Sequence, residues 1–161
     1  MFQGSAAVSE EAATQQYWEA SYLDVDRFVS YAYQLEAILN LAPRTLLEVG
    51  IGPGIISGFL RNAGLEVTTC DLARSLNPDC LGDIRALPFK EDQFDVAVAF
   101  EVLEHLPFSE LERAAAELHR VSRRHVVISL PYSCASFHAA FRINAWRLAR
   151  TVSFADRKSV V

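Results

Sequence analysis

The ten residues Thr45 to Gly54, TLLEVGIGPG, decide the fold of this chain. A short apolar run, typical of a buried strand, leads directly into three glycines at alternate positions. Pro53 can begin the helix that follows, because proline at the first helical position loses no hydrogen bond that the helix needs. Glycine allows positive φ and close approach of a ligand, and the start of a helix offers free N–H groups and a positive dipole end. The stretch therefore predicts a binding loop for an anionic or polar ligand.

A second feature, Asp71, comes about twenty residues after Gly50 and ends the next apolar run. A carboxylate at this place can accept hydrogen bonds from both hydroxyls of a ribose, so the spacing indicates a nucleoside ligand. The alternative is a tight glycine turn with Asp71 capping the helix after it. A dinucleotide fingerprint would need a third glycine at position 55, where the chain has Ile55, so the match to NAD is defective.

Short apolar runs alternate with helix-length segments along the chain. The runs are Thr45 to Val49, Leu65 to Cys70, Phe94 to Phe100 and His125 to Leu130, with a weaker strand just before Asp83. This alternation predicts an α/β fold with a doubly wound, mostly parallel sheet and helices on both faces. Residues 109–122 have one apolar face, and Ser109 with Glu112 predicts a capping box at the start of that helix.

Length and composition limit the possible functions. The chain has 161 residues and a formal net charge of −5, which favours one domain and argues against general nucleic-acid binding. No stretch approaches the roughly 20 apolar residues that cross a bilayer, and the N-terminus has no signal-peptide pattern. Three cysteines without a CxxC pair predict neither disulfides nor a zinc site, so we expect a cytoplasmic protein.

The pattern divides the chain into three parts after a short leader. We expect residues 1–9 to be a disordered leader and residues 10–161 to be one domain. Its parts are N-terminal helices over residues 10–42, a ligand-binding core over residues 44–130, and a helical C-terminal segment over residues 131–161. In the first part, Tyr17, Trp18 and Tyr22 recur near helical spacing. Such a stripe forms either core or a lid over a ligand.

Four motifs stand in one order along the chain: LLEVGIGPG from Leu46, CDLA from Cys70, GDIRALPF from Gly82 and FDVAVAFEVLEHLP from Phe94. Together they resemble the class I S-adenosylmethionine-dependent methyltransferases, most closely the branch that methylates small molecules. The resemblance runs from about Tyr17 to Pro131. It implies a Rossmann-like methyltransferase fold, S-adenosylmethionine as methyl donor, S-adenosylhomocysteine as product and a small-molecule acceptor.

The resemblance implies roles for the residues of the first strand and its loop. Glu48 matches the acid that orders the loop and the methionine ammonium. Gly50, Gly52 and Gly54 match the loop beneath the methionine portion, where bare backbone is needed for close approach. Asp71 matches the ribose acid.

Further along the chain, the resemblance implies the adenine and acceptor sides of the site. Asp83 with Ile84 matches the pair that holds adenine, and this assignment also disfavours an NAD or nucleotide-sugar enzyme. Phe100 and Glu101 follow the fourth strand, where the family borders the sulfonium and the acceptor. Each acid also has a simpler explanation as a helix cap or turn residue.

His105 is the candidate general base. It lies four residues beyond Glu101, on the same face if that turn is helical, and would take the proton of a hydroxyl acceptor. The alternative is a histidine that packs at the sheet edge or bonds a loop. Glu101 and Glu104 could be two ligands of a metal ion, but the sequence shows no evident third and fourth ligand, so we predict no metal. The signature Asn-Pro-Pro-Tyr is absent after the fourth strand, which disfavours the amino group of a base or amide as acceptor.

Only 31 residues follow Leu130, and they show a helical face rather than the two terminal strands usual in the family. That face consists of Phe137, Phe141, Ala145, Leu148 and Val152. We therefore expect a sheet without its terminal strands and a homodimer through this segment or the open sheet edge. The leading hypothesis is a methyltransferase. The alternative is a truncated or non-catalytic S-adenosylmethionine-binding module that acts as a partner subunit.

Overall fold

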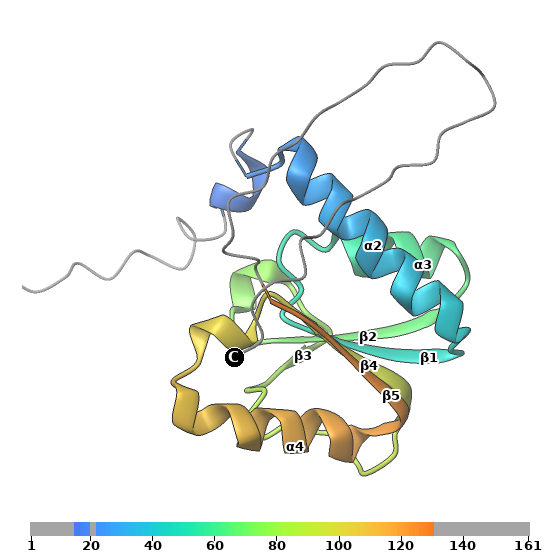
Figure 1. Cartoon of the computed structure of the whole chain (residues 1–161), viewed down its shortest axis with the longest axis vertical. Helices are drawn as coiled ribbons and strands as arrows, with labels where there is room; N and C mark the ends of the chain where they lie inside the picture. The colour runs from blue at the N-terminus through green and yellow to red at the C-terminus, as the bar shows by residue number, and fades with distance from the viewer. Residues whose placement is uncertain (1–14, 20–21, 131–161) are drawn as a thin grey trace, which may run out of the picture.

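A computed structural model describes residues 15–19 and 22–130 of the chain. Its centre is a sheet of five strands in the order β3-β2-β1-β4-β5, all paired in parallel (Figure 1). The strands are β1 Thr45–Val49, β2 Glu66–Asp71, β3 Cys80–Leu81, β4 Phe94–Phe100 and β5 Ser122–Ser129. The predicted α/β class with a doubly wound, mostly parallel sheet is confirmed. The predicted terminal segment, residues 131–161, lies outside the described residues.

Helices cover both faces of this sheet. On one face, α2 (Val25–Leu41) and α3 (Ile55–Asn62) pack Ile38 and Leu60 against Leu46 and Val98 of the central strands. On the other face, α4 (Leu111–Val121) packs against the same strands in a second apolar cluster. The members of that cluster include Leu47, Val49, Ala97, Ala99, Ala114, Leu118 and Val121. Because β1 and β4 are buried on both faces, they read as continuous apolar runs.

The N-terminal part has less helix than the sequence predicts. The first described element is a 3-10 turn, η1 (Gln16–Trp18), and residues 19 and 22–24, which come before α2, are not helical. Asp24 begins α2 because its carboxylate accepts the backbone N–H of Arg27 at 2.8 Å. The helix ends at Ala42, which adopts the left-handed conformation. Residues 10–14, also predicted as helix, lie outside the described part of the chain.

The approach to α4 corrects one prediction. Two 3-10 turns, η3 (Leu103–His105) and η4 (Phe108–Glu110), precede the helix. Ser109 lies inside η4, so α4 begins after Glu110 without a side-chain cap and the predicted capping box is wrong. At its other end α4 runs directly into β5, because Ser122 already pairs with Phe94. The strand thus begins three residues earlier than the sequence pattern indicated.

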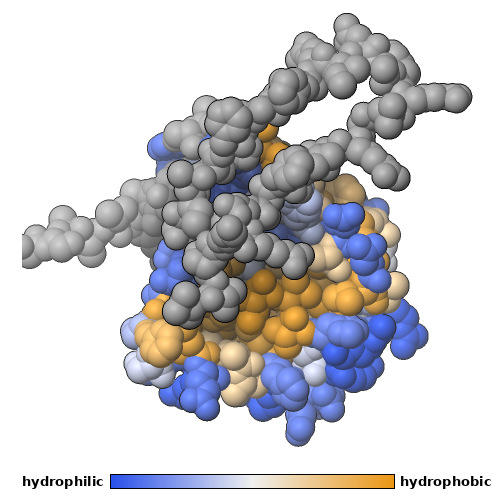
Figure 2. All heavy atoms as spheres, viewed as in Figure 1, coloured by the Kyte–Doolittle hydropathy of each residue, from blue (hydrophilic) through white to orange (hydrophobic). Residues whose placement is uncertain are grey.

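Strand β5 ends the sheet within the described residues. Its burial is low for a strand of a parallel sheet, with Ile128 39% and Leu130, just after it, 60% exposed. The view in Figure 2 shows an apolar area over β5, between α2 and α4. Within residues 15–19 and 22–130, no helix is long and apolar enough to span a membrane.

Candidate functional site

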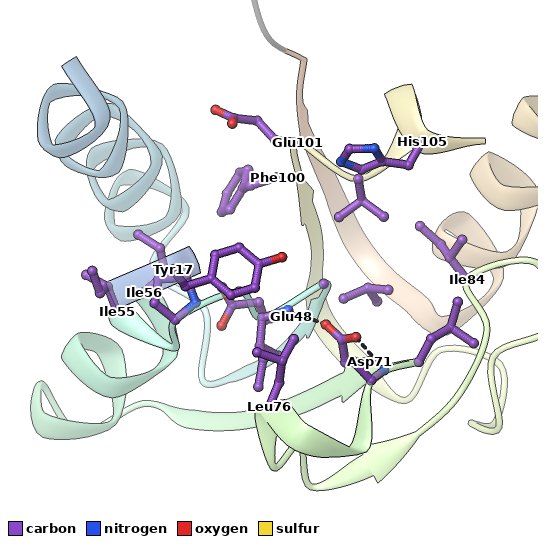
Figure 3. A pocket seen from close by; sticks show the side chains of 18 of the residues that line it. Tyr17, Glu48, Ile55, Ile56, Asp71, Leu76, Ile84, Phe100, Glu101 and His105 are labelled. Atoms are coloured by element: carbon purple, nitrogen blue, oxygen red, sulfur yellow. Dashed lines mark hydrogen bonds between the residues drawn. The ribbon is translucent and has the colours of Figure 1, made fainter. Parts of the chain in front are cut away.

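The carboxyl ends of the parallel strands meet at one edge of the sheet, where a pocket of about 720 Å³ opens. Its walls come from the loop after β1, the ends of β2 and β4, the turn after β4, and α2 with η1 (Figure 3). Small-molecule sites usually fall in this size range and in this position of an open α/β sheet. The location predicted for the ligand therefore coincides with a cavity.

The glycine loop forms the floor of the pocket. Gly50, Gly52 and Gly54 all have positive φ, at 79°, 47° and 73°. At Gly50 a Cβ atom would collide with the side chain of Val102, which comes from the turn after β4. Since both the backbone conformation and the space exclude larger residues, Gly50 allows β1 and the β4 turn to approach each other. Pro53, Ile55 and Ile56, at the start of α3, also line the cavity, and the first turn of a helix has N–H groups without partners inside the helix.

Asp71 ties the end of β2 to this loop. One carboxylate oxygen accepts the N–H of Ile51 at 2.9 Å, and the other accepts the N–H of Ala73 at 2.8 Å (Figure 3). Each oxygen can accept a further hydrogen bond, so the carboxylate keeps capacity for two hydroxyl donors. Asp71 thus organises the turn and also lines the pocket, and its role toward a ribose stays a prediction.

Glu48 is the most unusual acid of the site. It is only 3% exposed, it lines the pocket, and its Oε2 atom has no hydrogen-bond partner among the described residues. Burial raises the pKa of Glu48 to about 7, although hydrogen bonds from the Ser57 side chain and backbone N–H act in the opposite direction. A buried carboxyl oxygen without a partner is costly unless a donor from elsewhere completes it. The position therefore fits a cationic group of a ligand.

The loop after β3 brings Gly82 and Ile84 to the pocket wall, but not the side chain of Asp83. The Asp83 carboxylate instead accepts the N–H and guanidinium of Arg85, at 2.8 Å and 2.5–3.1 Å. Arg85 is the main reason that the pKa of Asp83 is lowered to about 2. The adenine role predicted for Asp83 stays a prediction, and it requires the carboxylate to serve a ligand beside Arg85.

The end of β4 forms the opposite wall, where Phe100 and Glu101 both line the pocket (Figure 3). Glu101 has φ 54°, a left-handed conformation that is uncommon for a residue other than glycine. Its carboxylate forms an ion pair with Arg27 of α2 and accepts the Ser30 hydroxyl at 3.5 Å. Strained backbone of this kind is often found at functional sites. The ion pair joins α2 to the edge of the sheet.

His105 lines the pocket from η3, as does its neighbour Glu104. Both residues are exposed. The backbone N–H of His105 donates to the carbonyl of Val102 at 3.1 Å. The imidazole thus reaches the cavity, and its role as base stays a prediction. In the described part of the chain, no three His, Cys, Asp or Glu residues are grouped so as to hold a metal ion.

Two aromatic residues of the N-terminal part line the pocket. Tyr17 and Tyr22 line the cavity and contact each other edge to face, with ring centroids 5.0 Å apart. Tyr17 lies next to the glycine loop, because a Cβ on Gly52 would come within 3.9 Å of its ring. Trp18 is 62% exposed and belongs to neither core nor pocket. The two tyrosines therefore line the pocket, and their role as a lid over a ligand stays a prediction.

Sequence reasoning missed the contribution of α2. Arg27, Tyr31 and Gln34 line the pocket from this helix. The Arg27 guanidinium lies 4.6 Å from the Tyr22 ring centroid, and the buried Tyr31 hydroxyl has no partner of hydrogen-bonding geometry among the described residues. Burial, followed by the charge of Tyr22, raises the pKa of Tyr31. A single arginine in an otherwise acidic and apolar helix was the one sequence signal available.

Acids dominate the charge of the pocket. Four carboxyl groups line it, from Glu48, Asp71, Glu101 and Glu104, against the single guanidinium of Arg27. A parallel 3-2-1-4-5 sheet with a glycine loop and acids at its carboxyl edge is the arrangement of a Rossmann-like methyltransferase domain. The sequence pattern of the methyltransferase domain family matches residues 47–130, and the chain belongs to that family, the class I S-adenosylmethionine-dependent methyltransferases.

Two curated relatives illustrate the similarity. The chain is 34% identical over 100 residues to the ubiquinone biosynthesis O-methyltransferase of Bordetella parapertussis, covering 52% of this chain and 42% of that protein. It is 33% identical over 91 residues to the malonyl-[acyl-carrier protein] O-methyltransferase of Pseudescherichia vulneris, covering 50% of this chain and 36% of the relative. The matched region is thus about two fifths of the length of these relatives.

Solved structures show the same fold at low sequence identity. A protein from Methanococcus maripaludis assigned to the S-adenosyl-L-methionine-dependent methyltransferases superposes with a TM-score of 0.61 and 16% identity. That match covers 80% of this chain and 67% of the other. A SAM-dependent methyltransferase from Archaeoglobus fulgidus gives a TM-score of 0.52 at 16% identity, covering 60% and 48%.

Proposed function

We propose that this chain binds S-adenosylmethionine in the pocket at the carboxyl edge of its sheet and transfers the methyl group to an oxygen of a small molecule. The observation that carries the proposal is the buried Oε2 of Glu48, which has no partner among the described residues and lines the cavity beside the glycine loop. A cationic ammonium would complete it. The excess of carboxyl groups in the pocket supports a donor that carries positive charge.

Each part of such a donor has matching residues. Glu48 and the loop of Gly50, Gly52 and Gly54 would hold the methionine portion, since bare backbone permits close approach there. The free capacity of Asp71 suits the two ribose hydroxyls. Ile84 offers an apolar surface to adenine, with Asp83 as the candidate acceptor for its amino group.

The reaction needs little more from the protein than alignment. When bound, S-adenosylmethionine supplies a methyl group on a positively charged sulfur that is itself the leaving group. Phe100 and Glu101 border the space for the acceptor, and the tyrosines of the N-terminal part exclude water from it. If the acceptor is a hydroxyl, His105 is the candidate group to take its proton.

An oxygen acceptor is proposed because both relatives described above are named O-methyltransferases, one acting in ubiquinone biosynthesis and one on a malonyl group. We also propose that the protein works in the cytoplasm without a metal ion. Free thiols at Cys70 and Cys80 support a reducing compartment.

The direct test is isothermal titration of the chain with S-adenosylmethionine and with S-adenosylhomocysteine. We expect both to bind, and absence of binding would refute the proposal. Asp83→Asn should weaken both affinities if the carboxylate serves adenine. Asp79→Asn is the matched control, because Asp79 lies in the same region but bonds Thr69 and Arg61 rather than lining the pocket.

A second candidate function is a cofactor-binding module that acts as a partner subunit. One observation favours it: β5 ends the sheet within the described residues and leaves Ile128 and Leu130 exposed. A homodimer through this edge would belong to either function. Methyl transfer by a cofactor-bound monomer would exclude the module hypothesis, and acceptors with a phenolic hydroxyl or a carboxylate are the first to assay.

A further inference from the structure

Helix α2 is apolar on both sides, although only one side faces the sheet. Its inner side buries Tyr31 and Ile38, as expected for a helix that covers a core. The outer side also carries large apolar side chains, which the described residues leave exposed. They are Val25 (77% exposed), Phe28 (52%), Val29 (46%), Tyr33 (50%) and Leu39 (44%). A contiguous exposed patch of large apolar side chains usually marks an interaction site, so this surface is expected to have a partner.

The outer side of α2 continues into a groove beside α3. The groove is lined by Ala32, Tyr33, Leu39 and neighbouring α2 residues, together with Phe59 of α3, which is 51% exposed. Figure 1 shows the two helices next to each other on the same side of the sheet. The apolar surface therefore belongs to two elements that are held rigidly by the core.

Ala32 is a small exposed residue near the middle of α2. Val25 and Leu39 lie seven residues to either side of it, and Phe28 and Glu36 lie four residues to either side. Residues at these intervals share one helix face. In an antiparallel pair of identical helices that cross at Ala32, each position meets its mirror position on the other copy. Val25 of each copy would then meet Leu39 of the other, and Phe28 would meet Glu36.

The exposed area is of the size that a dimer needs. An aromatic side chain has about 150–250 Å² of surface, so the exposed fractions of the five α2 side chains and Phe59 sum to roughly 500 Å². A standard interface buries about 800 Å² on each partner, of which a little over half is apolar. These six side chains would thus supply most of the apolar part of such an interface.

We propose that two copies of this chain associate through their α2 helices, which pack antiparallel around a two-fold axis at Ala32. In antiparallel packing the N-terminus of each helix lies beside the C-terminus of the other, so the two helix dipoles attract each other. Glu36 is the charged residue nearest the centre of the stripe, and its two copies would stand about 12 Å apart along the helix axis. At that separation salt screens most of their repulsion. The interface differs from the sheet edge at β5.

The dimer would act on the ligand pocket through the same helix. Arg27, Tyr31 and Gln34 line the cavity from the inner side of α2, and Arg27 is held to Glu101 at the end of β4. Fixing the outer side of α2 would therefore fix one wall of the pocket. The association itself requires no ligand, so its test is independent of the proposed methyl transfer.

Sedimentation velocity of the full chain over a concentration series measures the association. We expect a dimer at tens of micromolar and below, since an interface of this area supports micromolar affinity or better. Ala32→Glu places two like charges at the two-fold axis and should weaken the dimer by at least a hundredfold. Ala116→Glu is the matched control, because Ala116 is also an exposed alanine within a helix, α4, and should leave the dimer unchanged.

A cross-linking experiment tests the geometry directly. In an antiparallel pair that crosses at residue 32, Ala32→Cys brings two thiols together, so mild oxidation should give a covalent dimer joined at that position. Ala116→Cys should not. The proposal is overturned by a wild-type monomer at about 100 µM, by a dimer that Ala32→Glu leaves intact, or by a disulfide between position 32 and Cys134 of the same chain. The last result would instead assign the cover to residues 131–161.

Discussion

The contact between Gly50 and Val102 offers the sharpest test of how the pocket is built. Gly50 ends β1 with φ 79°, and its N–H donates to the carbonyl of Cys70 at 2.9 Å. A methyl group added at Gly50 would overlap the Val102 side chain in the turn after β4. Gly50→Ala therefore introduces two costs, one from backbone conformation and one from packing.

The two costs can be estimated separately. A left-handed conformation costs an L-residue about 1–2 kcal/mol, of which a smaller unfolded-state entropy returns about 0.5 kcal/mol. Overpacking against Val102 costs about 1–3 kcal/mol, because both backbone segments are fixed by the sheet. We expect Gly50→Ala to lower the free energy of unfolding by roughly 2–4 kcal/mol. Val102→Ala alone, at a half-buried position, should lower it by about 1 kcal/mol.

The double variant separates the packing cost from the backbone cost. In Gly50→Ala with Val102→Ala the overlap disappears while the left-handed φ remains. The double variant should therefore lose less free energy of unfolding than the two single variants added together, by about 1–2 kcal/mol. Urea unfolding followed by circular dichroism measures all four free energies at one pH. If the two substitutions are additive within about 0.5 kcal/mol, the contact does not exist as described.

Three further predictions concern the acids and the histidine of the pocket. Since burial raises the pKa of Glu48 to about 7, its ionisation lowers stability progressively from pH 4.5 to about 7, by roughly 3 kcal/mol in total. Glu48→Gln should leave the free energy of unfolding unchanged at pH 4 and raise it above pH 7, as measured by thermal or urea unfolding. The same substitution should weaken S-adenosylmethionine binding. Equal stability of the variant and the wild type at pH 8 would contradict this reasoning. Asp71→Asn has one oxygen for the N–H groups of Ile51 and Ala73, so unfolding in urea should show a loss of about 1–3 kcal/mol, and no loss would mean that these bonds are not formed. His105→Gln should lower the turnover number roughly a hundredfold and leave the cofactor affinity, measured by titration, unchanged; an unchanged turnover number would exclude His105 as the base.

Local patterns in the sequence were sufficient for the elements and their order. The apolar runs at Thr45–Val49 and Phe94–Phe100 predicted β1 and β4 correctly because those strands are buried on both faces. The run at β5 was less informative, since its first residues Ser122, Arg123 and Arg124 are polar or charged and yet pair with β4. The capping box at Ser109 failed because two 3-10 turns occupy the stretch where a helix start was expected.

The pocket itself required the tertiary structure. The sequence by itself determined the glycine loop, Glu48 and Asp71, because each depends on a strand and the turn that directly follows it. Only the fold brought Arg27 of α2 to Glu101, which follows β4 and lies 74 positions away in the sequence. The sequence alone also does not show which apolar side of α2 is exposed, because this depends on which side of the helix packs against the sheet. Pattern fixes what is local, whereas contacts between distant segments depend on how the layers pack.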